Sequence, residues 1–304
     1  MKATPRDWMM LAALGLIWGA AFPVTGVATE DFGTLTLSAT RLLIGALALL
    51  AVLVIRRVSL PALSERRFWA FALAAGIVTN ALPFTLLSWA QRHVDAGFAG
   101  VAVATVPLFV LPLAHVFVEG ERMTWRKVMG FGLGFVGIVV LIGPQVLAGL
   151  GGSVVLILAQ LACLGTAFCY ASGSIIAKRA PQLGLLQFGA AGLLLGAAIA
   201  LPLALMAEGM PALPSARGAV AMLYLGLVPT GVATILLLAV IASAGPSFLS
   251  LVNYQVPVWA VLLSVVFLGE APSARLGLAL VIIFLGLAVS QGMVGLRRGG
   301  HARG

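Results

Sequence analysis

Charged residues are scarce in this sequence, and their scarcity excludes a water-soluble protein. They make up 9% of the chain, whereas an average soluble domain has roughly 25%. Hydrophobic residues reach 62%, and the mean hydropathy is +1.13. They fall in repeated runs of about 20 residues, the length of helix that crosses a hydrocarbon core of about 30 Å. We therefore expect an integral membrane protein.

Cysteine is also rare, which argues against a disulfide framework or a metal centre. The two cysteines, Cys163 and Cys169, lie in one apolar run without a second pair, so we expect them to pack as small residues. No metal and no cofactor are predicted. The net charge of +9 is spread over single or paired basic residues between the apolar runs. Lipid, and not nucleic acid, is therefore the expected partner of this charge.

The apolar runs divide the chain into ten expected spans. Charged or Gly- and Pro-rich breaks separate the runs, and the short loops leave no room for a soluble domain. Backbone N–H and C=O groups in lipid must be satisfied within their own segment, so each span is predicted to be a helix. The expected spans are 8–28, 35–55, 68–90, 97–117, 126–144, 153–177, 185–206, 217–241, 247–268 and 275–295.

Basic residues are distributed unequally between the two sides of this arrangement. With the N-terminus inside, 14 of the 18 Lys and Arg residues fall on the cytoplasmic side, three fall on the other side, and Arg41 lies within a span. Cytoplasmic loops of membrane proteins are enriched in Lys and Arg. We therefore predict that both termini are cytoplasmic.

The second half of the chain repeats features of the first. The turn at 120–126 matches the turn at 269–275, each with Gly-Glu at its start and Arg at its end, at an offset of 149 residues. Because five spans are an odd number, the second half enters the membrane from the opposite side. This predicts an inverted repeat with halves 1–148 and 149–304, the architecture of many secondary transporters, whose substrate site lies near the midplane.

Three local motifs carry a resemblance to a known family. They are LeuIleTrpGlyAlaAlaPhePro at 16–23, ThrArgLeu at 40–42, and the Gly-Glu turn before a Gly-rich helix in each half. On these motifs the chain resembles the ten-helix EamA-type exporters of the drug/metabolite transporter superfamily, over nearly its whole length. Among them it looks most like the bacterial aromatic amino acid exporters. One departure is that Trp18 becomes Leu164 in the second half, so any role of Trp18 is not duplicated.

The resemblance implies an all-α carrier in the bacterial inner membrane. Such a carrier is not an enzyme, and it exports amino acids, aromatic and other neutral ones above all, or related small metabolites. Its partners are then a small-molecule substrate and the lipid bilayer, and we expect a monomer rather than a dimer.

Polar and aromatic residues inside the spans are the candidates for a substrate cavity. A polar side chain in lipid is costly unless it pairs or faces water, and an aromatic ring can offer its face to an ammonium group. The alternative for each residue is packing or hydrogen bonding between helices. The adjacent residues 253–255 form the sharpest group, because three neighbours cover most of a helix turn. The candidates are Trp18, Phe22, Thr79, Asn80, Phe84, Tyr170, Thr230, Asn253, Tyr254, Gln255 and Trp259.

Prolines and two basic side chains complete the candidates. Pro107 and Pro257 lie 150 residues apart in matching helices, so we expect hinges there, with static kinks as the alternative. Two roles are open for Arg41: attraction of a substrate carboxylate, or snorkelling and hydrogen bonding to backbone carbonyls. His115 either relays protons or satisfies local packing.

Acidic residues are missing from the middle of every expected span. Ion-driven carriers usually hold their ion with such a residue, so we predict export without ion coupling. One rival class is an intramembrane serine hydrolase using Ser172 or Ser174 with His115, but the Gly-Xaa-Ser-Xaa-Gly elbow is absent. The other rival is a channel, for which two inverted halves offer no ring of identical filter groups.

Overall fold

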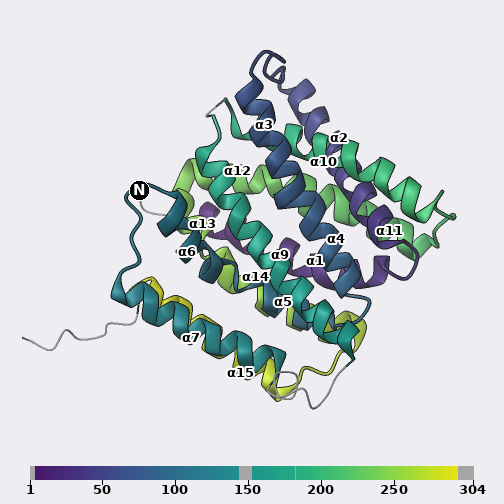
Figure 1. Ribbon diagram of the computed structural model, residues 1–304. Coiled ribbons are helices and arrows are strands. Elements are labelled where there is room, and N and C mark those ends of the chain that lie inside the picture. Colours follow the sequence, from purple (N-terminus) through teal and green to yellow (C-terminus); the bar gives the residue numbers. More distant parts are fainter. Residues whose placement is uncertain (1–3, 144–152, 182, 294–304) are drawn as a thin grey trace, which may run out of the picture.

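The chain folds into a bundle of apolar helices. The computed structural model describes residues 4–143, 153–181 and 183–293, and within them it contains helices, turns and loops without strands (Figure 1). The expected boundary between the halves at 148/149 lies outside the described residues, as do Lys2, Arg297, Arg298 and Arg303.

The first half supplies five spans, close to the expected ranges. The third and the fourth are each built from more than one helical segment. The elements are α1 (Pro5–Ala28), α2 (Thr34–Ile55), α3, η1 and α4 (Arg66–Ala75, Gly76–Ala81 and Leu82–Ala90), α5 and α6 (Ala96–Val103 and Val106–Phe117), and α7 (Trp125–Ile142).

The second half supplies the other five spans in the same order. Its third and fourth members are again composite, and two of its helices, with 17 residues each, are shorter than the other spans. The prediction of ten spans is confirmed. The elements are α9 (Val154–Arg179), α10 (Leu185–Glu208), α11, η2 and α12 (Ala216–Leu225, Gly226–Val232 and Ala233–Ala244), α13 and α14 (Pro246–Leu249 and Val252–Leu268), and α15 (Ala274–Ser290).

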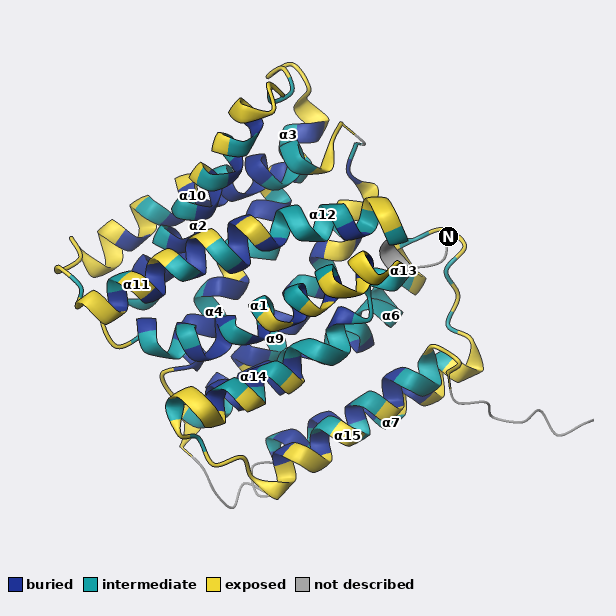
Figure 2. Cartoon of the chain, turned by 180° about the vertical axis from the view of Figure 1, so that it is seen from behind, coloured by how far each residue is buried: buried dark blue, intermediate teal, exposed yellow. Residues whose placement is uncertain are grey.

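Hydroxyl side chains fix where five of the helices begin. Thr4, Thr124, Ser153, Ser215 and Ser273 each accept a hydrogen bond from the backbone N–H three residues later. This contact satisfies one of the N–H groups that a helix start leaves without a partner. Outside these caps, exposed residues recur along the outward faces of the helices (Figure 2). Large apolar ones are among the exposed residues, for example Val54, Leu203 and Phe267. The lipid would cover them.

The helix contacts are symmetric under exchange of the halves. The first span packs on the eighth and the ninth, and the sixth span, its counterpart, packs on the third and the fourth. Three pairs consist of a span and its own counterpart: α2 with α10, α5 with α14, and α7 with α15. We call these the axial pairs, because a two-fold axis that exchanges the halves must run between their members.

Each axial pair runs antiparallel, which is the direct sign of inversion. Glu208, at the end of α10, contacts the start of α2. Glu270, just after α14, contacts the start of α5. We call the side of the bundle with these contacts the second end, and the opposite side, where α1 begins, the first end. Whether the first end faces the cytoplasm stays a prediction.

The α7–α15 pair stands at one side of the bundle (Figures 1 and 2) and is held alike at both of its ends. Arg126 lies against Gly292 at one end, and Arg275 lies against Gly143 at the other. These two arginines are the residues that the 149-residue offset had matched. Between the ends, a Cβ on Gly286 would lie 2.5 Å from Gly134 N, so the backbones touch. Small residues permit such close packing of membrane helices.

The third and eighth spans both widen into a π-helical turn in mid-span. η1 begins at Gly76 and η2 begins at Gly226, 150 residues later. Such turns break the regular pattern of backbone hydrogen bonds and frequently mark functional sites. They contain three of the predicted cavity residues: Thr79, Asn80 and Thr230.

Candidate functional site

The most unusual group in the bundle is the guanidinium of Arg41. This side chain lies two turns into α2 and is only 6% exposed. Its Nε donates a hydrogen bond of 3.0 Å to Thr230 Oγ1, and its Cζ lies 3.9 Å from the ring centroid of Phe84. The cation therefore rests on an aromatic face, which attracts it electrostatically, and is fixed at one edge by a hydroxyl.

The π-helical segment η2 places that hydroxyl. Thr230 Oγ1 donates to Leu225 O at 2.8 Å, a carbonyl of the preceding turn, so its oxygen is free to accept from Arg41. Gly45, one turn after Arg41 on α2, lets η2 approach, because a Cβ there would lie 2.5 Å from Thr230 Cγ2. The same segment offers the carbonyl of Pro229, which accepts a 3.2 Å hydrogen bond from Trp18 Nε1.

Two tyrosines complete the surroundings of Arg41. Tyr170 on α9 was a predicted cavity residue, and it packs in one apolar cluster with Phe84. Tyr224 on α11 was not predicted; its phenol and that of Tyr170 are the ionisable neighbours of the guanidinium. The chain has three tyrosines, and this scarcity was the available signal for Tyr224. Of the predicted residues, Phe84 and Thr230 thus contact Arg41, Tyr170 packs with Phe84, and Trp18 binds the segment that carries Thr230.

No carboxylate balances Arg41 within the described residues. The ion pairs there join Lys127 and Lys178 to Glu121, and Arg217 to Glu30, all in loops or at helix ends. A buried ion without a partner is costly, and such groups inside membrane proteins mark substrate or ion pathways.

Other predicted residues lie away from this group. Phe22 is buried in a core cluster with Ala99 and Ala260. Thr79 presses against Gly173, and its buried hydroxyl has no partner in the described part of the chain. Asn80 donates to Ala75 O at 3.2 Å, inside its own span.

The cluster at 253–255 spreads in three directions. Asn253 donates to Ser250 O, in the break just before α14. Tyr254 turns to α15, with its ring 5.3 Å from that of Phe284. Gln255 lies against Gly15 of α1, and Trp259, one turn later, lies against Gly19. In the described contacts none of the four residues reaches Arg41.

The hinge candidates differ in their surroundings. Pro107 is the second residue of α6, directly after the break at 104–105. Pro257 lies inside α14, six residues after the break at 250–251. Both fourth spans of the halves are therefore broken, but the break is shifted relative to the proline. Their role as hinges stays a prediction.

His115 and the two serines of the rival hydrolase have separate partners. His115 Nδ1 lies 3.2 Å from Glu121 O. Ser172 donates to Phe168 O and Ser174 to Ala171 O, both within α9. Among the described hydrogen bonds, none joins His115 to either serine.

Carboxylates close the second end of the bundle. Glu270 accepts from Ala96 N at 2.7 Å and from Gly97 N at 3.0 Å. Glu208 accepts from the N–H groups of Leu35 and Thr36, both at 2.9 Å, and from the Thr36 hydroxyl. An anion at a helix start is stabilised by the free N–H groups and by the helix dipole. Two axial pairs are therefore fastened at this end.

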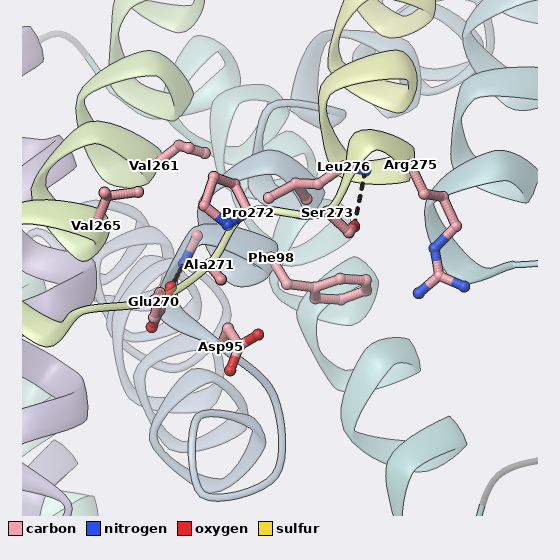
Figure 3. Close-up of a pocket in the computed structure, with 11 residues that line it drawn as sticks. Asp95, Phe98, Val261, Val265, Glu270, Ala271, Pro272, Ser273, Arg275 and Leu276 are labelled. Atoms are coloured by element: carbon pink, nitrogen blue, oxygen red, sulfur yellow. Dashed lines mark hydrogen bonds between the residues drawn. The ribbon is translucent and has the colours of Figure 1, made fainter.

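The surroundings of Glu270 appear in Figure 3. A pocket of about 210 Å³ lies beside it, lined by the start of α5 and the turn between α14 and α15. The figure shows Arg275 pointing away from Glu270, on the far side of Ser273. Glu270 thus makes its contact with helix N–H groups and not with the nearest arginine.

The first end is arranged differently. Glu121, the repeat counterpart of Glu270, accepts a 3.0 Å hydrogen bond from Lys127 Nζ, which lowers the pKa of its carboxyl. Between α2, α10 and α12 this end has a cavity of about 290 Å³, lined by Arg56 and Leu186 among others.

Known proteins share this architecture. The model of the EamA-like transporter family matches residues 7–143 and 157–291. A solved structure, described only as the crystal structure of a protein, superimposes with a TM-score of 0.67 at 23% identity, covering 96% of this chain and 99% of that chain. This likeness shows a shared fold.

Named relatives cover nearly the whole chain. The "Uncharacterized inner membrane transporter YedA" of Escherichia coli (strain K12) is 30% identical over 286 residues, 93% of this chain and 90% of the relative. The "Probable terminal-alkyne amino-acid exporter" of Streptantibioticus cattleyicolor is 29% identical over 309 residues, 98% of this chain and 97% of the relative.

Proposed function

The chain belongs to the EamA-like transporter family of the drug/metabolite transporter superfamily, and from this premise we propose that it exports amino acids or related small metabolites by alternating access. It is a multi-pass protein of the inner membrane. Aromatic and other neutral amino acids are the proposed substrates. A relative named as an amino-acid exporter and the aromatic side chains around Arg41 support this substrate class.

The main support for this mechanism is that two glutamates at equivalent positions of the repeat make different contacts. Glu270 binds the start of α5, whereas Glu121 binds lysines of its own end. The two glutamates therefore hold the two ends of the bundle by different contacts. An inverted repeat whose halves adopt unequal states can exchange those states, and the exchange opens one end while it closes the other.

The α2–α10 pair also differs between its two ends. The α2–α10 pair is fastened at the second end by Glu208, and at the first end it borders a cavity. The α7–α15 pair is held alike at both ends, so it would act as the static support. With the first end cytoplasmic, as the charge distribution predicts, this is the state in which an exporter loads its substrate.

A growth test addresses the substrate class. Bacteria that overproduce the chain should resist toxic aromatic amino acid analogues such as 4-fluorophenylalanine, because export lowers the internal concentration. Ser174→Ala should protect equally well, since the described hydrogen bond of Ser174 stays within α9, whereas a hydrolase that used this serine would lose its effect. Normal membrane expression without protection against any analogue would count against amino acid export.

A vesicle test addresses ion coupling. We propose export driven by the substrate's own gradient, because the described carboxylates lie at helix ends or in loops and none reaches Arg41. Vesicles with the purified protein should therefore equilibrate labelled L-phenylalanine, and an imposed pH difference alone should not concentrate it. Accumulation against the gradient under that pH difference would show proton coupling and overturn this part of the proposal.

A further inference from the structure

We infer that Arg41 is the anchor for the carboxylate of the transported molecule. The inference rests on the proposed transport function, and it assigns a chemical group of the substrate to one side chain. A carboxylate is the ligand class because the site offers a buried, charged guanidinium whose two terminal nitrogens have no hydrogen-bond partner among the described residues.

The guanidinium of Arg41 is contacted on one edge and on one face. Thr230 Oγ1 accepts a hydrogen bond from Nε, and the ring of Phe84 covers one face of the guanidinium. The two terminal nitrogens have no hydrogen-bond partner among the described residues, and neither counts among the fully buried polar atoms that lack one. They are therefore not completely enclosed, and their hydrogen-bonding capacity is unused by the described residues. Paired N–H groups of arginine match the two oxygens of a carboxylate.

The charge of Arg41 lacks a counter-ion among the described residues. Arg41 is 94% buried on the basis of its 6% exposure, and no described acid pairs with it. Snorkelling would carry its head group to the surface, and hydrogen bonding to helix carbonyls would occupy its terminal nitrogens; the structure shows neither arrangement. An anionic ligand would supply the missing charge in a region of low dielectric constant, where the attraction is strongest.

Arg41 has no charged counterpart in the second half of the chain. The corresponding stretch of α10, at an offset of 148 to 150 residues, is Gly189, Ala190 and Ala191, which carries no charge. The site is therefore asymmetric about the two-fold axis. One carboxylate fits each carrier, and the rings of Tyr170 and Tyr224 on the opposite half remain for the rest of the molecule.

The unmodified protein provides the first test, without any risk of misfolding. Four compounds form a matched set: L-phenylalanine, L-phenylalaninamide, 3-phenylpropionate and 3-phenylpropionamide. The two acids should raise the midpoint of thermal unfolding of the detergent-purified chain, because a ligand that binds the folded state stabilises it. The two amides should not. Equal shifts with acids and amides, or no shift with any of the four, would overturn the inference.

Variants of Arg41 provide the second test. Arg41→Gln should weaken binding of the stabilising acid by about tenfold or more, the effect of losing one charge-assisted pair, and Arg41→Lys should fall between the two. A merely structural arginine would lower the unfolding midpoint of the empty protein and leave the difference between acid and amide intact, and that result would refute the inference. If Arg41→Gln does not fold, the acid and amide comparison on the unmodified chain decides.

The same set separates this inference from the proposed substrate class. Stabilisation by 3-phenylpropionate and not by L-phenylalanine would support the carboxylate anchor and overturn amino acid export. Stabilisation by L-phenylalanine and L-phenylalaninamide alike would do the reverse.

Discussion

Bridging residues 97 and 270 should stop transport completely. The proposed variant is Gly97→Cys with Glu270→Cys, in a background where Cys163 and Cys169 are alanine, treated with a short bifunctional thiol reagent. A Cβ on Gly97 would lie 3.2 Å from Glu270 Oε2, so two cysteines there are within reach of each other. The bridge would hold the start of α5 against the end of α14 and keep the second end shut. Counterflow of labelled L-phenylalanine in vesicles measures the effect.

A matched pair on the static support provides the control. Arg126→Cys with Gly292→Cys joins the start of α7 to the end of α15 at two exposed positions, where a Cβ on Gly292 would lie 3.3 Å from Arg126 Nη1. The same reagent should leave transport nearly unchanged there, because this pair is held alike at both ends. Reagents with a cleavable spacer allow the bridge at 97 and 270 to be reversed. Undiminished counterflow with the 97–270 bridge in place would contradict alternating access through the second end.

The spans and the repeat were predictable because their signals are local. A run of apolar residues fixes the length of a membrane helix without knowledge of its neighbours. The offset that matched Arg126 with Arg275 also reflects geometry, because each of these arginines lies at the start of its helix against a glycine at the end of the partner helix. Inversion then follows from counting five spans per half.

The composition of the site was less predictable, because it depends on which helices meet. Each membrane helix carries apolar residues on all of its faces, so its sequence does not indicate which face turns toward the other helices. Phe84, Tyr170 and Thr230 were selected as polar or aromatic residues in spans, and they gather at Arg41. The adjacent residues 253–255 were selected on the same grounds, and the structure spreads them over three neighbours.

The closing carboxylates were missed for a related reason. In the sequence, Glu208 was only an acid outside the middle of a span, and Glu270 was part of the repeated Gly-Glu turn. Solvated acids also lie at such positions, so neither residue indicated a partner. Their partners, at Leu35, Thr36, Ala96 and Gly97, are more than 170 residues away in sequence. Such pairing is decided by the antiparallel contact of counterpart spans, which only the folded bundle reveals.

Replacing Gly286 by leucine should strongly destabilise the contact between α7 and α15. Its Cβ would lie 2.5 Å from Gly134 N and 2.7 Å from Gly130 O, and both are backbone atoms that cannot turn aside. The helices must separate, and overpacking of this kind costs about 1–3 kcal/mol or more. The midpoint of thermal unfolding in detergent should fall, together with the yield from membranes.

Gly277→Leu is the matched control for this change. Gly277 lies on the same helix, α15, and a Cβ there meets nothing within 4 Å, so the leucine would point to lipid. Its effect should stay within about 0.5 kcal/mol, as for other substitutions at unpacked surface positions. Equal losses for the two variants would mean that the cost comes from leucine itself, and the close contact of α7 with α15 would then not hold the support together. A loss of stability for Gly286→Leu alone would show that the close contact of α7 with α15 stabilises the protein. A static support for two moving helix pairs requires such a contact.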